Sequence, residues 1–322
     1  MMKAFILYRP GDPEYLCMSE KPIPTPSEGQ VLVKVRAFGL NRSEIMTRKG
    51  LSPDVVFPRV LGIECVGEVE IDPSGTLLKG QKVAAFMGGM GRDFDGSYAE
   101  YALLPVTILM PFESDLSWEI LGALPEMFQT CYGSLHLALG IASGETLLIR
   151  GGTSSVGLLA AQMAKTNRLK VISTTRTVEK ERFLLEKGVD RVLIDDGNLT
   201  EKIHKENLII DKVLELVGTS TLKDSLQCVR PGGTVCMTGM LSEQWSIADF
   251  APMEYIPPTV KLTSYDSGQL RVESKYFQQF VDNIEHGKIS PIIKHTFRLD
   301  QLVEAHRYME SNAGGGKIVV LT

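Results

Sequence analysis

The sequence predicts an α/β protein with two domains, one a β-rich barrel or sandwich and the other built on a doubly wound parallel sheet. Three observations lead to this fold class. The chain has 322 residues, which is long enough for two cores of ordinary size. Its first part alternates short apolar runs with turn residues, and its middle part alternates strand-like with helix-like segments.

The N-terminal part of the chain predicts short strands separated by turns. Residues 31–37 alternate apolar and polar side chains with the period of two expected of a half-buried strand, and residues 67–71 and 97–103 are similar. Turns with glycine stand at 80–82 and 88–96. Strands at this spacing are typical of a barrel or a sandwich.

The middle part, from about Ser117 to Tyr265, predicts alternating strands and helices. The predicted strands are 146–150, 169–175, 192–194, 209–216 and 234–238, and the helices among them are 155–166, 178–187 and 199–206. This βαβ succession indicates a parallel, doubly wound sheet. The last part is mixed, with predicted helices at 274–285 and 300–310 and predicted strands at 292–298 and 317–321.

Composition and charge argue against several classes of protein. Hydrophobic residues make up 43% of the chain and charged residues 23%, which is ordinary for a folded chain in water. A net charge of −5 disfavours nucleic-acid binding, and no apolar stretch is long enough to cross a bilayer or to act as a secretory signal. The 5 cysteines are scattered and form no CxxC motif, so we expect a reduced, cytoplasmic protein.

A turn of small residues at 151–157 carries the pattern of a dinucleotide-binding loop, because it follows a predicted strand and opens a predicted helix. We expect Gly152 to make the tight turn, Gly157 to let the helix approach the strand, and Ser154 to offer a hydroxyl to a phosphate oxygen. The helix N-terminus also favours an anion. The alternative is a glycine turn that only packs the helix on the sheet. The predicted cofactor contacts are Gly152, Thr153, Ser154, Ser155, Val156 and Gly157.

The end of the second predicted strand bears on the choice between NAD and NADP. An NAD site carries an acidic residue there, which holds the ribose 2′-hydroxyl. This chain instead has Thr174, Thr175 and Arg176, whose hydroxyls and guanidinium suit a 2′-phosphate. The alternative is that Arg176 is a solvated loop residue. We predict NADP(H) as the cofactor, and we also assign Lys180 and Met240 to its site.

Short motifs follow one another along the whole chain. They are Gly39-Leu-Asn41-Arg-Ser-Glu, Arg48-Lys-Gly50, Gly62-Ile-Glu64-Cys-Val-Gly67, Gly80-Gln-Lys-Val83, Gly96-Ser-Tyr-Ala-Glu100-Tyr, the loop at 151–157, Pro231-Gly-Gly233 and Gly315-Gly-Lys317-Ile-Val-Val. In this combination and order the chain resembles the medium-chain dehydrogenase/reductase superfamily, and within it the zinc-independent quinone oxidoreductase (zeta-crystallin-like) branch.

The resemblance implies two domains with defined bounds. Residues 1–120 and 266–322 would form a GroES-like β-barrel catalytic domain. Residues 121–265 would form the inserted Rossmann NADP-binding domain, and the active site would lie in the cleft between the two.

The resemblance also bears on metal binding. Zinc alcohol dehydrogenases of this superfamily have three zinc ligands at positions that correspond here to Asn41, Ile63 and Glu126. Isoleucine has no donor atom, and a neutral amide is a poor zinc ligand. The four clustered cysteines of the structural zinc lobe are missing as well. We therefore expect neither zinc site to exist in this protein.

A site without a metal favours an acceptor that is already activated, because a simple alkoxide would lack strong stabilisation. The resemblance implies that Asn41 faces the substrate or ribose and that Thr130 lies near the nicotinamide. Glu126 departs from the family pattern, and a partly buried carboxylate at this position is a candidate proton relay. The alternatives are structural: Asn41 braces a loop, Thr130 caps a helix, and Glu126 pairs with a backbone N–H or an arginine.

Three further residues are predicted to line the substrate pocket. Ser52 lies in a segment where many quinone reductases carry a tyrosine. Enoyl-thioester reductases use that tyrosine as a proton donor, so the absence of a tyrosine here disfavours enoyl-thioester reduction. Met127 and Phe128 are apolar candidates, for which core packing is the alternative.

These observations together predict an NADPH-dependent, zinc-independent reductase of quinones or similar activated carbonyls. An enone or enoyl-thioester reductase is one alternative, and a low-turnover NADPH-binding sensor or structural protein is another. We also expect a homodimer that pairs through an edge strand at 260–264, because an unpaired strand edge seeks a partner.

Overall fold

The computed structural model describes residues 1–269, 272–311 and 315–322. The chain packs into two compact units, each with its own β-structure and core. Unit 1 comprises Met1–Phe128, Val272–Gly287 and Ile293–Thr322, and unit 2 comprises Gln129–Arg271 and Lys288–Ile292. The predicted domain boundaries, at 120/121 and 265/266, lie a few residues before the corresponding bounds of these units.

Unit 1 is built on two sheets drawn from both ends of the chain. The larger has seven strands, in the order β15-β16-β3-β5-β6-β8 with β7 also paired to β3, and the smaller has the order β2-β1-β4. Their bounds are β1 Met2–Leu7, β2 Leu16–Lys21, β3 Gln30–Leu40, β4 Arg59–Val60, β5 Glu64–Ile71, β6 Lys82–Phe86, β7 Tyr101–Pro105, β8 Leu109–Pro111, β15 Ile293–Arg298 and β16 Lys317–Leu321.

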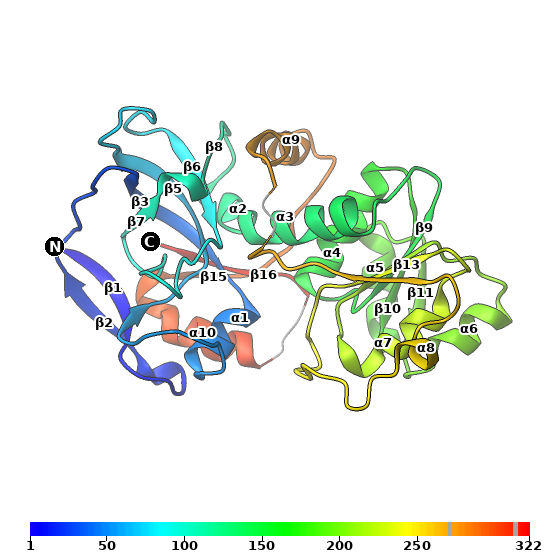
Figure 1. The fold of residues 1–322 in the computed structure, drawn as a ribbon. Coiled ribbons are helices and arrows are strands. Elements are labelled where there is room, and N and C mark those ends of the chain that lie inside the picture. The colour runs from blue at the N-terminus through cyan, green and yellow to red at the C-terminus, as the bar shows by residue number, and fades with distance from the viewer. Residues whose placement is uncertain (270–271, 312–314) are drawn as a thin grey trace. The chain divides into compact units, whose positions relative to one another are not determined.

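The C-terminal strand completes the sheet that the N-terminal strands begin. β16, from the C-terminal end of the chain, pairs with β3 in one sheet (Figure 1). The two strands run antiparallel, with Ile318 opposite Leu40 and Val319 opposite Gly39. The next residue back along β16, Lys317, therefore lies level with Asn41, where β3 ends. This register brings together two residues that are far apart in the sequence.

The helices of unit 1 are short apart from two near the C-terminus. Their bounds are α1 Arg42–Arg48, α2 Trp118–Gly122, α9 Ser274–Glu285 and α10 Leu302–Glu310, with 3-10 turns η1 Pro13–Tyr15, η2 Val106–Ile108 and η5 Leu299–Gln301. Helix α3, Pro125–Tyr132, begins in unit 1 and ends in unit 2.

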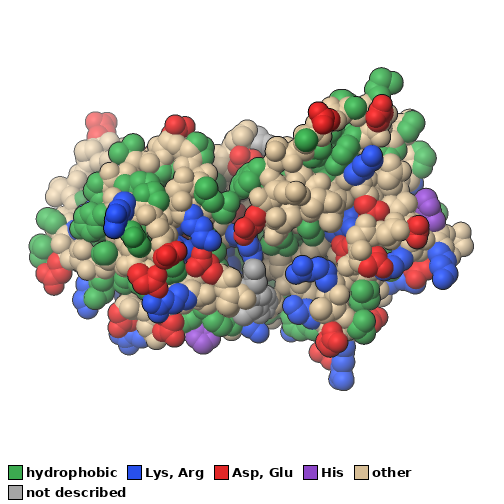
Figure 2. Space-filling model, turned by 90° about the horizontal axis from the view of Figure 1, so that it is seen from below, with side chains coloured by type: hydrophobic (Ala, Val, Ile, Leu, Met, Phe, Trp, Pro, Cys, Tyr) green, Lys and Arg blue, Asp and Glu red, His purple; other side chains and the backbone are tan. Residues whose placement is uncertain are grey.

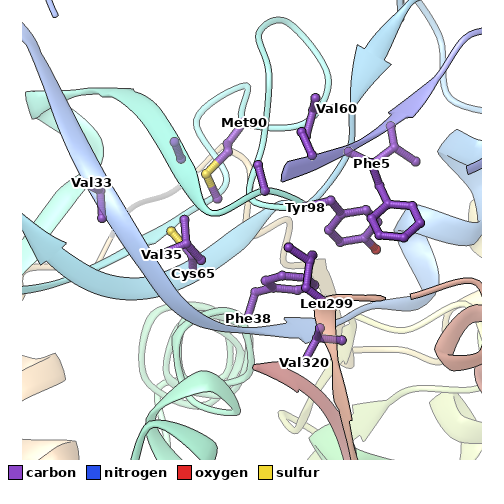
Figure 3. Close-up of a cluster of buried hydrophobic side chains, with 14 of the residues drawn as sticks. Phe5, Val33, Val35, Phe38, Val60, Cys65, Met90, Tyr98, Leu299 and Val320 are labelled. Atoms are coloured by element: carbon purple, nitrogen blue, oxygen red, sulfur yellow. The ribbon is translucent and has the colours of Figure 1, made fainter. Parts of the chain in front are cut away.

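The core of unit 1 packs aromatic and branched side chains from β1, β3, β16 and the loop before β7. Phe38 stacks on Tyr98 with ring centroids 5.0 Å apart, and Phe5, Leu299 and Val320 lie around this pair (Figure 3). Tyr98 falls inside the predicted strand 97–103, but the strand begins only at Tyr101. The backbone before it turns instead, since Ser97 N donates to Gly62 O and Tyr98 N to Leu61 O.

Unit 2 is a parallel six-stranded sheet in the order β11-β10-β9-β12-β13-β14, which is the doubly wound order in which the first strand lies near the middle. The strands are β9 Thr146–Arg150, β10 Lys170–Thr175, β11 Arg191–Ile194, β12 Lys212–Glu215, β13 Thr234–Met237 and β14 Lys261–Ser264. The helical segments are η3 Gly133–Ala138, α4 Ser155–Thr166, η4 Val178–Lys180, α5 Glu181–Glu186, α6 Leu199–Lys205, α7 Thr219–Cys228 and α8 Pro252–Tyr255. The predicted fold class is confirmed.

The surface shows no segregation of charge on the face drawn in Figure 2, where Lys and Arg side chains lie among Asp and Glu. Within the described residues, none of the helices combines the length and the apolar character that crossing a bilayer requires.

Candidate functional site: a phosphate loop and a buried polar centre

The loop between β9 and α4 in unit 2 is shaped by three glycines. Gly151 has φ +88°, a left-handed conformation that glycine adopts without strain. A Cβ on Gly152 would lie 1.7 Å from Ser173 Oγ, and one on Gly157 would lie 2.8 Å from Gly151 O. The left-handed turn therefore falls on Gly151 rather than on Gly152, and Gly152 and Gly157 let strand, loop and helix approach closely.

Ser154 serves the helix rather than a ligand. Its Oγ donates to Gly151 O over 2.8 Å and accepts from Gly157 N over 3.0 Å, so it is the N-cap of α4. In this conformation the hydroxyl hydrogen is used by Gly151 O, which differs from the expectation that it donates to a phosphate oxygen.

Backbone N–H groups at the start of α4 remain available to an anion. Those of Thr153, Ser155 and Val156 make no hydrogen bond within the described parts of the chain, and all three residues are partly exposed. The helix dipole adds positive potential at this end. Free donors, a positive dipole end and close-packed glycines together fit a pyrophosphate.

The end of β10 supplies cations. Thr174 Oγ1 accepts from Gly151 N over 3.1 Å, and the Thr175 hydroxyl bonds with the backbone of Thr177, so both hydroxyls brace the loop. Both threonines are buried. Arg176 and Lys180, by contrast, are exposed and have no ion-pair partner among the residues that the structure describes. The two cations are exposed and can meet a phosphate, whereas the two threonine hydroxyls are buried.

Arg150, the last residue of β9 before the loop, is held by two ion pairs. It is fully buried and pairs with both oxygens of Asp195 at 2.8 Å and with Asp224 at 2.7 Å. Burial alone would lower the pKa of Arg150, but these carboxylates raise it above its usual value. No local sequence pattern indicates this cluster, because Asp195 and Asp224 stand 45 and 74 residues away from Arg150.

A buried polar centre occupies the ends of β3, β5 and β16 in unit 1. Lys317 Nζ lies 2.7 Å from Glu64 Oε1 and 2.6 Å from Asn41 Oδ1, and Asn41 Nδ2 donates to Glu64 Oε1 over 2.8 Å. The exposed fraction is 2% for Lys317 and 0% for Glu64, whereas Asn41 is partly exposed. The three side chains thus form a closed ring of hydrogen bonds around a buried ion pair.

The backbone around this ring is held by two carboxylates. Glu126 N donates to Glu64 Oε2 over 2.8 Å. Glu44 accepts from Asn41 N over 2.7 Å and from Ile63 N over 2.9 Å. Burial raises the pKa of Glu44 to about 7, although the two backbone donors oppose this shift. The three positions that the resemblance aligns with zinc ligands, Asn41, Ile63 and Glu126, are therefore tied together by Glu44 and Glu64.

These residues do not fit a zinc ion. Ile63 offers no donor atom, the amide oxygen of Asn41 is bonded to Lys317, and the ammonium group places a positive charge where a cation would have to bind. In the described parts of the chain, His, Cys, Asp and Glu side chains form no group of three or more that could hold a metal ion.

The other predicted site residues lie in different surroundings. Thr130 is buried in α3, and Met240 is partly exposed after β13. Ser52 Oγ shares a hydrogen bond of 2.8 Å with Thr47 Oγ1. Phe128 is fully buried, stacked on Phe280 with centroids 5.0 Å apart, and Met127 is buried next to it in the sequence. This burial favours the alternative that Met127 and Phe128 are core residues.

Comparison with known proteins matches two parts of the chain to known protein families. Residues 27–114 match the family model of the alcohol dehydrogenase GroES-like domain, and residues 187–320 match that of the zinc-binding dehydrogenase. The chain belongs to the medium-chain dehydrogenase/reductase superfamily. It is an oxidoreductase, and unit 2 has the nicotinamide dinucleotide-binding dehydrogenase fold.

Individual relatives cover the whole chain. The quinone oxidoreductase of Lama guanicoe is 29% identical over 340 residues, which span 100% of this chain and 98% of the relative. An acryloyl-coenzyme A reductase of Sulfurisphaera tokodaii is 26% identical over 346 residues, 99% of each chain. A mycobacterial protein solved in complex with NADPH has a TM-score of 0.86 at 24% identity, covering 100% of both chains, and so supports the fold.

Proposed function

We propose that this protein is an NADPH-dependent, zinc-independent reductase that transfers hydride to quinones or similarly activated carbonyls. The observation that carries the proposal is the ring of Asn41, Glu64 and Lys317, in which Asn41, one of the three positions aligned with zinc ligands, is hydrogen-bonded to both members of an internal ion pair. The relatives named quinone oxidoreductase agree with it. A quinone spreads the incoming charge over its ring, so it needs no metal ion to stabilise an alkoxide.

The preference for NADPH rests on the exposed cations at the end of β10. Bound NADPH would supply the hydride. Arg176 and Lys180 would pair with its 2′-phosphate, while the free N–H groups of Thr153, Ser155 and Val156 would hold the pyrophosphate. No carboxylate stands at this strand end to bind a free ribose diol instead, since Thr174, Thr175 and Arg176 occupy it.

The acceptor would be oriented by the amide of Asn41. One Nδ2 hydrogen is bonded to Glu64, and within the described parts of the chain the other has only a long 3.5 Å hydrogen bond to Gly39 O, so it can be donated to a carbonyl oxygen instead. The acceptor gains a hydride with its two electrons, and the resulting phenolate or enolate takes up one proton from solvent. We propose Thr130 near the nicotinamide and Glu126 as a proton relay.

Reduction of an enoyl thioester is the second candidate, because one relative is named an acryloyl-coenzyme A reductase. The chemistry is similar, since an α,β-unsaturated thioester also delocalises the incoming charge into an enolate. Ser52 stands where such reductases carry a tyrosine acid, and its hydroxyl is bonded to Thr47, so we rank this activity second.

We also propose that the protein is a homodimer. β14 is the last strand of the six-stranded sheet and pairs only with β13 among the described strands, so its other edge can pair with a second copy. Light scattering should give twice the mass of the chain, and a monomer at micromolar concentration would contradict this.

The function is tested by a panel of acceptors. Oxidation of NADPH should be fastest with ortho- or para-quinones, slower with enones and acryloyl-coenzyme A, and slowest with saturated aldehydes. The activity should survive EDTA and phenanthroline. A tenfold preference for a simple ketone or alcohol, or loss of activity together with chelated zinc, would reject the proposal. The absence of turnover with every acceptor would favour a binding protein instead.

A further inference from the structure

The Asn41 amide stands between a buried cation and a buried anion. Its oxygen accepts from Lys317 and its nitrogen donates to Glu64. The opposite orientation would set Nδ2 against the ammonium group and Oδ1 against the carboxylate. Both contacts would be repulsive, and with exposed fractions of 2% and 0% for the two charged residues little water screens them.

Gly39 keeps the ion pair in place. A Cβ at this position would lie 2.3 Å from Lys317 Cε and 2.5 Å from Glu64 Oε1, so the two side chains fill the space that any other residue would need. Lys317 itself is fixed by the register of β16 on β3. The charges that face Asn41 are therefore held on a rigid sheet and not on a loop.

The ring leaves one amide hydrogen weakly held. Asn41 is partly exposed while its two partners are buried, and among the described residues its second Nδ2 hydrogen has only the long 3.5 Å hydrogen bond to Gly39 O. A hydrogen bond from an ammonium group to Oδ1 draws electron density from the amide and strengthens the donors on Nδ2.

We infer that the Lys317–Glu64 ion pair is a positioning device that orients and polarises the Asn41 amide toward the carbonyl oxygen of the acceptor. Lys317 and Glu64 are positioning residues, since they act through Asn41 and do not touch the acceptor. The inference rests on the proposed function only in its identification of the acceptor as a carbonyl compound.

The kinetic test is a mutant cycle. Lys317→Met/Glu64→Gln removes both charges without leaving either one unpaired, and it is compared with Asn41→Ala and with the triple variant. We expect kcat/KM for a quinone to fall at least tenfold in the double variant while the Kd for NADPH stays within twofold. The triple variant should be no worse than Asn41→Ala. Losses that multiply would show that the pair acts independently of Asn41 and would overturn the inference.

Two further variants keep this test decisive. Lys79→Met/Glu70→Gln removes an exposed ion pair of 2.6 Å in the same unit and should keep wild-type kinetics. If the buried double variant does not fold, Glu64→Asp keeps both charges but draws the carboxylate back from Nδ2 by one methylene group, and an unchanged kcat/KM there would overturn the inference.

A second readout needs no activity. In protein labelled with 15N-asparagine, the Asn41 side-chain signals are identified by their loss in Asn41→Ala. We expect these two hydrogen signals to be widely separated in the wild type and to approach those of exposed asparagines in the double variant. Unchanged signals would reject the orienting role. If the wild type reduces no acceptor, the proposed function fails, but this measurement still tests the ion pair.

Discussion

The phosphate loop of unit 2 and the polar centre of unit 1 both gather polar groups at strand ends, but they satisfy them differently. In the loop, the N–H groups of Thr153, Ser155 and Val156 have no partner within the described residues, and Arg176 is exposed. In the polar centre, Lys317 and Glu64 bond to each other and are buried. The loop therefore has donors available for a ligand, whereas the charged groups of the polar centre are already paired with each other and also bond to the side chain of Asn41.

This difference has an energetic consequence. Exposed cations contribute little to folding, so changing one should weaken ligand binding and leave stability alone. A buried ion pair is the reverse case, because removing one partner leaves an uncompensated charge in a medium that solvates it poorly. Substitutions of the exposed cations should therefore change cofactor affinity alone, and substitutions in the polar centre should change the free energy of unfolding.

The largest effect is expected for Lys317→Met. It leaves the Glu64 carboxylate buried without its cation, and the free energy of unfolding should fall by about 3–5 kcal/mol. Urea unfolding measures this directly. Adding Glu64→Gln should restore most of the loss, since no charge is then unpaired. A single variant as stable as the wild type would mean that the ion pair is not buried in solution.

The next effect is a dependence of stability on pH, carried by two buried groups of unit 1. Burial raises the pKa of Glu44 to about 7 from 4.5, so the native state binds its proton more tightly, and this stabilisation is lost as pH rises from 4.5 to 7. Burial, with Arg48 nearby, lowers the pKa of His306 to about 3 from 6.5, so its stabilisation is lost as pH falls from 6.5 to 3. The two slopes oppose each other between pH 4.5 and 6.5.

Glu44→Gln removes one of these slopes. Relative to the wild type, the free energy of unfolding of the variant should rise with pH by about 1.4 kcal/mol per pH unit between pH 4.5 and 6.5. Urea titrations at several pH values test this. Parallel pH profiles for the two proteins would show that Glu44 titrates normally and that burial does not raise its pKa.

A smaller effect, confined to binding, is expected for Arg176→Ala. One charge-assisted hydrogen bond to the 2′-phosphate contributes about 1.5–3 kcal/mol, so the Kd for NADPH should rise roughly 10–150-fold while that for NADH is nearly unchanged. Calorimetry or fluorescence gives both constants. Arg182→Ala, at an exposed arginine paired with Glu186, is the matched control and should change neither. Equal losses for both cofactors in Arg176→Ala would mean that Arg176 does not read the phosphate.

The smallest effect is expected for Ser154→Ala. The change removes the N-cap of α4, which should cost about 1 kcal/mol of stability. Because its hydroxyl is used by Gly151 and Gly157, the ratio of the Kd values for NADPH and NADH should not change. A shift of that ratio with unchanged stability would return Ser154 to the role of a phosphate ligand.

Elements with a strong local pattern could be predicted closely from the sequence. Strands β9 and β16 and helices α4 and α9 have the predicted bounds, because apolar periodicity and a cap or turn at each end define them locally. Helix α7, Thr219–Cys228, was missed, and so was strand β1, Met2–Leu7. The predicted helix 178–187 is a 3-10 turn followed by the shorter α5.

The candidate site divides in the same way. The glycines of the loop and Arg176 could be identified from residue types and their order, and the unsuitable zinc positions from the family resemblance. Lys317 could not, because its partners Glu64 and Asn41 are separated from it by most of the chain; Asn41 is 276 residues away. The sequence also could not show that the hydroxyls of Ser154 and Thr174 are used by the backbone.

The sequence by itself determined the βαβ order of unit 2, the place of its phosphate loop and the lack of a donor at Ile63. These follow from short-range rules on backbone conformation, side-chain alternation and ligand chemistry. Only the tertiary structure decided that β16 would pair with β3 and so set an ammonium group against Asn41. Sheet register and the exclusion of water determine which polar groups pair in a folded interior. Neither can be predicted from a local stretch of residues.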